Sequence, residues 1–125
     1  MIGVDANVLI EIALKRKDVD ACQKYIESAT EKLAVTMLTV DLVMYYAESN
    51  KLNLHKIRNF LKQFLWIDLT EEDGDKAFDL YEDDDYEDAL QITCTMRAGC
   101  KTFATLDKGL AKKYKDKIKV DLLSS

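Results

Sequence analysis

Short apolar runs alternate with longer amphipathic stretches along the whole chain, and this alternation limits the possible folds most strongly. The short runs are rich in β-branched and aliphatic residues and predict strands. They cover residues 1–5, 32–38, 66–69, 101–106 and 118–122. The stretches between them carry apolar residues at helical spacing. They predict helices at residues 7–15, 19–29, 39–48, 54–65, 71–81, 86–98 and 108–114. Strands that alternate with helices indicate an α/β fold, with a parallel sheet between two layers of helices.

Few residues in the chain break regular structure. It has 125 residues, no proline and four glycines, one of which, Gly99, ends the predicted helix 86–98. No linker or low-complexity stretch marks a second domain. Hydrophobic residues make up 48% of the chain, enough for a core without disulfides or structural metals. We therefore expect residues 1–125 to form one domain.

Charge and cysteine content narrow the class of protein. The net charge is −5, so contact with nucleic acid has to be local instead of spread over the surface. The odd number of cysteines (Cys22, Cys94, Cys100) and the lack of a C-x-x-C spacing indicate reduced thiols. With His55 as the only histidine, a zinc site is not expected. No membrane-span or signal-peptide pattern is present, and we expect a cytoplasmic protein.

Four acids lie where predicted strands meet predicted helices. They are Asp5, Asp41, Asp88 and Asp107. In a parallel α/β sheet, ligands bind beyond the carboxyl ends of the strands, where helices begin. We therefore expect these carboxylates to converge at one edge of the sheet.

Two explanations fit such acids. Convergent carboxylates raise one another's pKa unless a cation neutralises them, and Mg²⁺ with its oxygen ligands and retained waters suits a phosphodiester substrate. Aspartate is also a favoured helix N-cap, which accounts for each acid taken singly. Only their convergence would favour the metal site.

Three sequence motifs occur in an order that indicates a known family. They are the run 4–10 (VDANVLI), the run 88–90 (DAL) with apolar residues after it, and the run 103–110 (FATLDKGL). Together they resemble the motifs of the PIN-domain family, with VapC-like toxin ribonucleases as the nearest match, over essentially the whole chain. The resemblance implies a three-layer α/β/α sandwich with a mainly parallel sheet of about five strands.

The resemblance also implies a function. It implies a Mg²⁺- or Mn²⁺-dependent endoribonuclease, a homodimer, and a small antitoxin protein as partner. The metal ligands would be Asp5, Asp88 and Asp107, with Asn7 and Thr105 supporting them by hydrogen bonds. Asp41 would complete the catalytic acids.

One position departs from the family pattern. The family has a glutamate in its third helix where this chain has Leu42, and Asp41 lies one residue earlier. One residue turns a helix by about 100°, so Asp41 reaches the site only if the helix is rotated. This departure supports a second hypothesis, a catalytically impaired module with the same fold that binds RNA or a protein partner.

A third hypothesis is a phosphoacceptor signalling domain, which also gathers acids at a sheet edge. Such a domain needs paired acids after the first strand, and here Ala6 and Asn7 follow Asp5.

Two runs of charged residues have an equally good structural explanation. The acid run 82–85 is typical of a solvated loop. The six lysines between 108 and 119 either hold RNA phosphates or form a solvated surface.

Overall fold

Five parallel strands form the centre of the protein in a computed structural model that describes residues 1–82 and 85–124. The strand order is β3-β2-β1-β4-β5, and every neighbouring pair is parallel. The strands are β1 (Ile2–Val4), β2 (Leu33–Thr36), β3 (Leu65–Ile67), β4 (Thr102–Thr105) and β5 (Lys119–Leu122). The expected α/β architecture is therefore confirmed, with a sheet that is wholly parallel.

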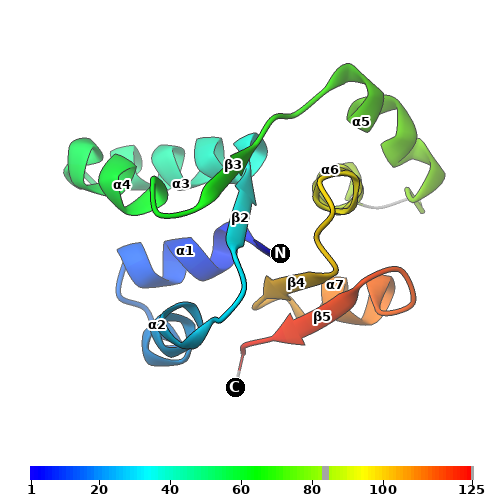
Figure 1. Ribbon diagram of the computed structural model, residues 1–125. Coiled ribbons are helices and arrows are strands. Elements are labelled where there is room, and N and C mark those ends of the chain that lie inside the picture. The colour runs from blue at the N-terminus through cyan, green and yellow to red at the C-terminus, as the bar shows by residue number, and fades with distance from the viewer. Residues whose placement is uncertain (83–84, 125) are drawn as a thin grey trace.

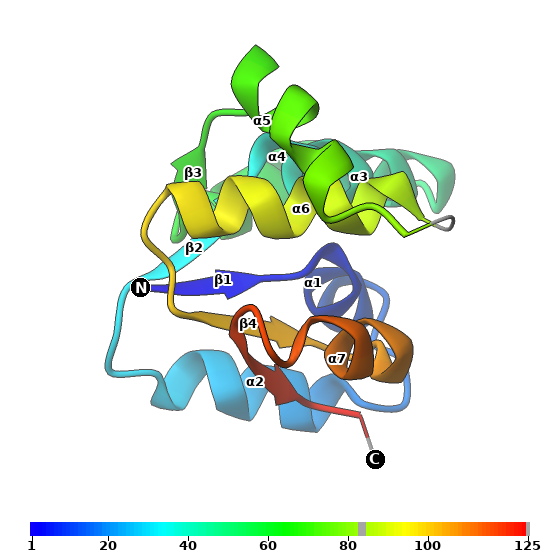
Figure 2. The ribbon, with the colours of Figure 1, turned by 90° about the vertical axis from the view of Figure 1, so that its right-hand side faces the viewer.

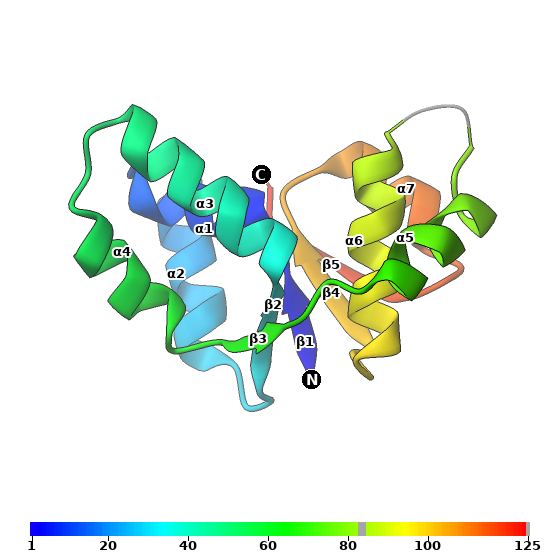
Figure 3. The same cartoon turned by 90° about the horizontal axis from the view of Figure 1, so that it is seen from above.

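Helices cover both faces of the sheet (Figure 1). The helices are α1 (Ala6–Ala13), α2 (Val19–Ser28), α3 (Met37–Ser49), α4 (Leu54–Leu61), α5 (Glu71–Lys76), the 3₁₀ helix η1 (Ala77–Asp79), α6 (Tyr86–Arg97) and α7 (Lys108–Tyr114). Seen from above, α1, α2, α3 and α4 lie on one side of the strands, and α5, α6 and α7 lie on the other (Figure 3). This is the expected three-layer sandwich.

The connections reverse direction between β1 and β4. From β1 the chain moves outward to β2 and β3 over one face, then returns across the sheet to β4, which pairs with β1. Right-handed crossovers place the two sets of helices on opposite faces because the two halves run in opposite directions. The carboxyl ends of β1 and β4 form the topological switch point, where ligands bind in such folds.

The predicted helix 54–65 extends too far at its C-terminal end. Helix α4 ends at Leu61, and Leu65 begins β3, where it pairs with Ala34 of β2. The apolar stripe continues past the helix because Phe64 remains in the core after the turn, at 5% exposure. Hydrophobic periodicity indicates which residues are buried, and here the buried residues continue beyond the end of the helix.

Glycine is required in the central strand because α6 passes close to it. A Cβ atom at Gly3 would lie 2.5 Å from Cγ2 of Thr95, whose side chain is fully buried. Gly99, at the C′ position of α6, has a φ of 93° and ends the helix as expected. Gly3 therefore sets the distance between the sheet and the helix that carries Asp88 (Figure 2).

A buried polar network joins the two helical layers. The Thr36 hydroxyl donates a hydrogen bond to Oε1 of Gln91 (2.6 Å), and Nε2 of Gln91 donates to the Thr39 hydroxyl (2.6 Å). The Thr39 backbone amide closes the network on the Thr36 hydroxyl at 3.2 Å. All three side chains are buried, so a broken bond would leave a costly unpaired group. The network fixes α6 relative to the start of α3.

Three further expectations concern the cysteines, the lengths of the helices and the number of domains. Cys22, Cys94 and Cys100 are buried and unpaired, as expected. Among the residues that the structure describes, no helix has both the length and the apolar character to cross a bilayer. The organisation of residues 1–125 as one domain remains a prediction.

A methyl group at Gly3 should destabilise the protein. We expect Gly3→Ala to lower the free energy of unfolding by about 1–3 kcal/mol, because the added Cβ overpacks the contact with Thr95. Urea denaturation followed by circular dichroism measures this change. The matched control is Gly74→Ala in α5, where the new Cβ would meet its nearest atom at 3.7 Å. The control should keep or raise stability by up to about 1 kcal/mol, and an equal loss in both variants would contradict the crowding argument.

Candidate active site

The first acid of the site follows directly from the end of β1. Asp5 is the N-cap residue of α1, and its backbone amide donates a hydrogen bond to the carbonyl of Ala104 in β4 (2.9 Å). Its side chain makes no capping hydrogen bond. The N-cap explanation therefore does not account for this carboxylate, which is free to act beyond its own helix.

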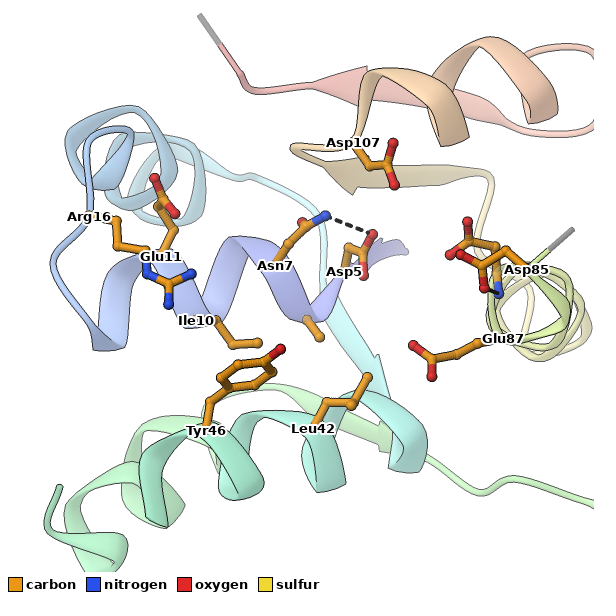
Figure 4. A pocket seen from close by; sticks show the side chains of 12 residues that line it. Asp5, Asn7, Ile10, Glu11, Arg16, Leu42, Tyr46, Asp85, Glu87 and Asp107 are labelled. Atoms are coloured by element: carbon orange, nitrogen blue, oxygen red, sulfur yellow. Dashed lines mark hydrogen bonds between the residues drawn. The ribbon is translucent and has the colours of Figure 1, made fainter. Parts of the chain in front are cut away.

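Neutral donors hold the Asp5 carboxylate in place. The Thr105 hydroxyl donates to Oδ2 of Asp5 at 2.8 Å. Nδ2 of Asn7 donates to the same oxygen at 3.2 Å, and Figure 4 shows this second bond. Oδ1 of Asn7 accepts from the backbone amide of Leu106 at 3.1 Å, and the Thr105 hydroxyl accepts from that of Asp107 at 3.0 Å. Asn7 and Thr105 thus make the supporting contacts that the sequence resemblance implies, and they connect the end of β1 to the end of β4.

The other acids come from α6 and from the residues after β4. Asp88 lies in the first turn of α6, where its backbone amide is capped by the Asp85 carboxylate (3.2 Å). Asp107 follows β4 and caps α7, accepting a hydrogen bond from the Leu110 amide at 3.1 Å. Asp107 thus has a structural role that Asp88, itself capped by another residue, does not have.

A pocket of about 320 Å³ brings these acids together. Its lining residues are Asp5, Ala6, Asn7, Ile10, Glu11, Arg16, Leu42, Tyr46, Asp85, Glu87, Asp88 and Asp107. Figure 4 shows side chains from α1, α3, α6 and the end of β4 facing this space. Six of the lining residues are acids and one is basic, so the pocket carries strong negative charge.

The carboxylates are electrostatically coupled. Burial raises the pKa of Asp5 to about 6, although the Thr105 hydrogen bond opposes the rise, and the charge of Asp107 adds to it. Burial also raises the pKa of Asp88 to about 7, and the charges of Asp85, Asp5 and Asp107 contribute further. Desolvation and like charges both disfavour ionisation, and a cation in the pocket would reverse both effects.

Asp41 does not join the site in this structure. It is the fifth residue of α3, its side chain is exposed, and it is not among the residues that line the pocket. Leu42 lines the pocket instead. One residue turns the helix by about 100°, and the helix lacks the rotation that Asp41 would need to face the pocket. The structure thus brings together Asp5, Asp88 and Asp107 without Asp41.

Several pocket residues were not singled out from the sequence. Asp85, expected in a solvated loop, is the N-cap of α6, and its spacing of three from Asp88 is a capping signal. Tyr46 lies one turn after Leu42, which places both on one face of α3. No sequence pattern indicates Arg16. The remainder of the acid run, 83–84, lies outside the described residues, and the lysines of 108–119 do not line the pocket.

The donor set suits a hard divalent ion that keeps part of its water shell. Within residues 1–82 and 85–124, no group of three or more His, Cys, Asp or Glu side chains is arranged so that it could hold a metal ion. The acids do share a pocket, and their carboxylate oxygens are the ligands that Mg²⁺ and Mn²⁺ prefer. Mg²⁺ is typically bound through one or two carboxylates and several waters. The site fits that kind of ion and excludes an all-protein cage.

The fold and the site define a class of protein: a parallel α/β sandwich with an acid-lined pocket at its topological switch point. Sequence comparison identifies the family within this class, since the PIN domain family model matches residues 2–116. The chain belongs to the PIN domain family. No curated protein matches the chain.

Solved structures with a similar fold include toxin proteins. A toxin–antitoxin complex from Klebsiella pneumoniae superposes with a TM-score of 0.82 at 16% identity, covering 100% of this chain and 99% of that chain. VapC20 from Mycobacterium tuberculosis, described as a toxin that cleaves the sarcin–ricin loop, gives 0.77 at 9% identity, covering 90% and 94%. VapBC2 from Rickettsia felis, bound to a fragment of promoter DNA, gives 0.69 at 13% identity, covering 98% of each chain. At these identities the likeness establishes the fold.

The raised pKa values predict how stability depends on pH. The folded protein keeps protons on Asp5 and Asp88 above their ordinary pKa of 3.8, up to pKa values of about 6 and 7. The stabilisation from these protons is fully present below about pH 4 and is lost as pH rises through about 6 to 7. The free energy of unfolding of the metal-free protein should therefore fall over this range, and Asp88→Asn should flatten the fall. Urea denaturation in EDTA at several pH values measures it.

The exposed Asp116 provides the control for this experiment. Asp116→Asn should reproduce the wild-type pH dependence, because its side chain is remote from the pocket. Parallel curves for the wild type and Asp88→Asn would show that the Asp88 carboxyl is not perturbed by the pocket.

Proposed function

We propose that this protein is a PIN-type endoribonuclease that requires Mg²⁺ or Mn²⁺. The observation that carries the proposal is the meeting of Asp5, Asp88 and Asp107 in one pocket, although 83 and 19 residues separate them in sequence. Membership of a family of nucleases supports the same conclusion. The switch-point position supports it too, because parallel α/β folds bind ligands there.

Each residue has a defined part in the proposed chemistry. Asp5, Asp88 and Asp107 hold the ion directly or through water, and Asn7 and Thr105 fix the Asp5 carboxylate by their hydrogen bonds. When bound, the ion supplies a Lewis acid that activates water and offsets the charge of the phosphodiester. The amides at the start of α1 add partial positive charge near the substrate phosphate.

The similar structures support a proposal for the biological setting. Two of them are toxin–antitoxin or VapBC complexes. We propose that the chain is the toxin of such a pair, with a small antitoxin protein as partner, and that it forms a homodimer. Three buried, unpaired cysteines agree with a reducing cytoplasm.

Loss of a pocket carboxylate should abolish cleavage. We expect Asp5→Asn and Asp88→Asn each to reduce Mn²⁺-dependent cleavage of single-stranded RNA by about a hundredfold or more, because the ion loses a ligand. EDTA should stop the wild-type reaction. Gel analysis of end-labelled RNA measures the rates, and circular dichroism confirms folding.

The control for this prediction is the surface variant Asp116→Asn, which should cleave at the wild-type rate. Unchanged, chelator-sensitive cleavage in both pocket variants would rule out the proposed site.

Leu42 favours one alternative function. It lines the pocket at the position where the family has an acid, and the site therefore has one carboxylate fewer to bind the ion. An impaired site would bind RNA or a protein partner without cutting. Calorimetry with Mn²⁺ separates the two functions, since an impaired site shows no saturable binding.

Restoring an acid at this position should strengthen metal binding. We expect Leu42→Glu to tighten Mn²⁺ binding by about tenfold and to raise the cleavage rate, because a fourth carboxylate would join the three proposed ligands Asp5, Asp88 and Asp107. The neighbouring variant Asp41→Asn should bind Mn²⁺ as the wild type does, because its side chain lies outside the pocket. Weakened binding in Asp41→Asn, with no gain in Leu42→Glu, would place the functional acid at position 41 after all.

A further inference from the structure

The pocket has two chemically different ends. Asp5, Asp107 and Glu87 lie toward one end, and Arg16 and Tyr46 lie toward the other (Figure 4). Glu11 lies beside Arg16 at that second end, where its buried carboxylate accepts a hydrogen bond from the Asp18 amide. The proposed chemistry uses only the acidic end. The opposite end combines a cation with an exposed aromatic ring, which is the combination that binds single-stranded nucleic acid.

Arg16 is the one basic side chain among the pocket residues that the structure describes. It forms no salt bridge with any other described residue, although six acids line the same pocket. Arginine without a carboxylate partner retains all five guanidinium donors, whose planar arrangement matches a phosphate. Its charge is therefore available for an anionic ligand.

The segment that carries Arg16 is anchored on α1. The Arg16 backbone amide donates to the carbonyl of Glu11 at 3.0 Å, and the Asp18 amide donates to the Glu11 carboxylate at 2.8 Å. Glu11 is 8% exposed, whereas Arg16 is exposed and Asp18 is half-buried, so the Asp18 bond to Glu11 is partly shielded from water. They fix the backbone on either side of Lys17 and hold the base of the Arg16 side chain beside the pocket.

Tyr46 supplies an aromatic face. It lies on α3 one turn after Leu42 and is 39% exposed, a high fraction for a ring that lines a pocket. Its ring meets that of Tyr45 edge to face, with centroids 5.5 Å apart. The apolar side chains of Ile10 and Leu42 line the pocket as well. A nucleobase lying against Tyr46 would thus meet apolar surface.

We propose that Arg16 and Tyr46 form a nucleotide subsite, in which Arg16 binds a backbone phosphate next to the one cleaved and Tyr46 stacks on a base. This subsite rests on the proposed function for its ligand, single-stranded RNA. It also explains how a chain with a net charge of −5 binds RNA, because the contact is confined to one cation and one ring beside the acids.

RNA-binding measurements test the subsite separately from catalysis. The probe is a fluorescently labelled single-stranded RNA, with Ca²⁺ replacing Mg²⁺ to keep it intact, and fluorescence anisotropy gives the dissociation constant over a range of salt concentrations. Arg16→Gln and Tyr46→Leu should each weaken binding by about tenfold. Arg16→Gln should also lower the slope of log K against log[salt] by about 0.7, whereas Tyr46→Leu should leave it unchanged. Arg16→Lys and Tyr46→Phe should retain most of the affinity.

Two variants outside the pocket provide matched controls. Phe78→Leu removes an exposed ring outside the pocket, and Arg58→Gln removes an exposed arginine on α4, so both should bind RNA as the wild type does. Mn²⁺ binding should be unchanged in Arg16→Gln and Tyr46→Leu.

The outcomes separate the two proposals. Wild-type affinity in Arg16→Gln and Tyr46→Leu, with cleavage intact, would overturn the subsite alone. Binding that depends on both residues in a wild type that does not cleave would support the subsite and overturn the nuclease. A wild type that neither binds nor cleaves RNA would overturn both.

Discussion

Like charges gathered at the carboxyl ends of β1 and β4 are the constraint on which the rest of this structure depends. Asp5 and Asp88 have raised pKa values because burial and neighbouring carboxylates both disfavour their ionised forms. Without a cation, this arrangement lowers stability at neutral pH. Such a loss of stability is expected where the negative charge is needed to bind a ligand, and acids with perturbed pKa values in a pocket are typical of functional sites.

Neutral contacts hold the acids against their mutual repulsion. Thr105 and Asn7 hold the Asp5 carboxylate without adding charge, since a hydroxyl and an amide supply the donors. On the other side, Gly3 admits α6 close to the sheet, and Gln91 connects α6 to the start of α3. These contacts fix the position of α6, which carries Asp88, in the helical layer on the other face of the sheet. In the proposed metal site, the packing would therefore position the ligands before an ion binds.

The order of the elements could be predicted because it follows from periodicity, which depends on local sequence. The acids of the site could be predicted because parallel topology assigns strand ends to one edge. The rotation of α3 could not. Apolar residues occur around nearly the whole helix in the run 37–49, so no single stripe indicates which side faces the pocket. Hydrophobic periodicity alone therefore does not distinguish Asp41 from Leu42. The family resemblance placed position 42 at the site, and with α3 packed against α1 it is Leu42 that lines the pocket.

Arg16 was unpredictable for a different reason. Its place in the pocket depends on the chain after α1 turning back and on Glu11 accepting a hydrogen bond seven residues ahead, a tertiary contact without a sequence signature. In the proposed subsite, Arg16 would supply the local positive charge that an acidic chain needs in order to bind an anionic ligand. A protein that contacted RNA over its whole surface would need a basic surface. Contact through one anchored guanidinium beside the proposed metal site does not require one. Under the proposals above, the acidic end of the pocket would bind the ion and the end that carries Arg16 and Tyr46 would bind the nucleotide.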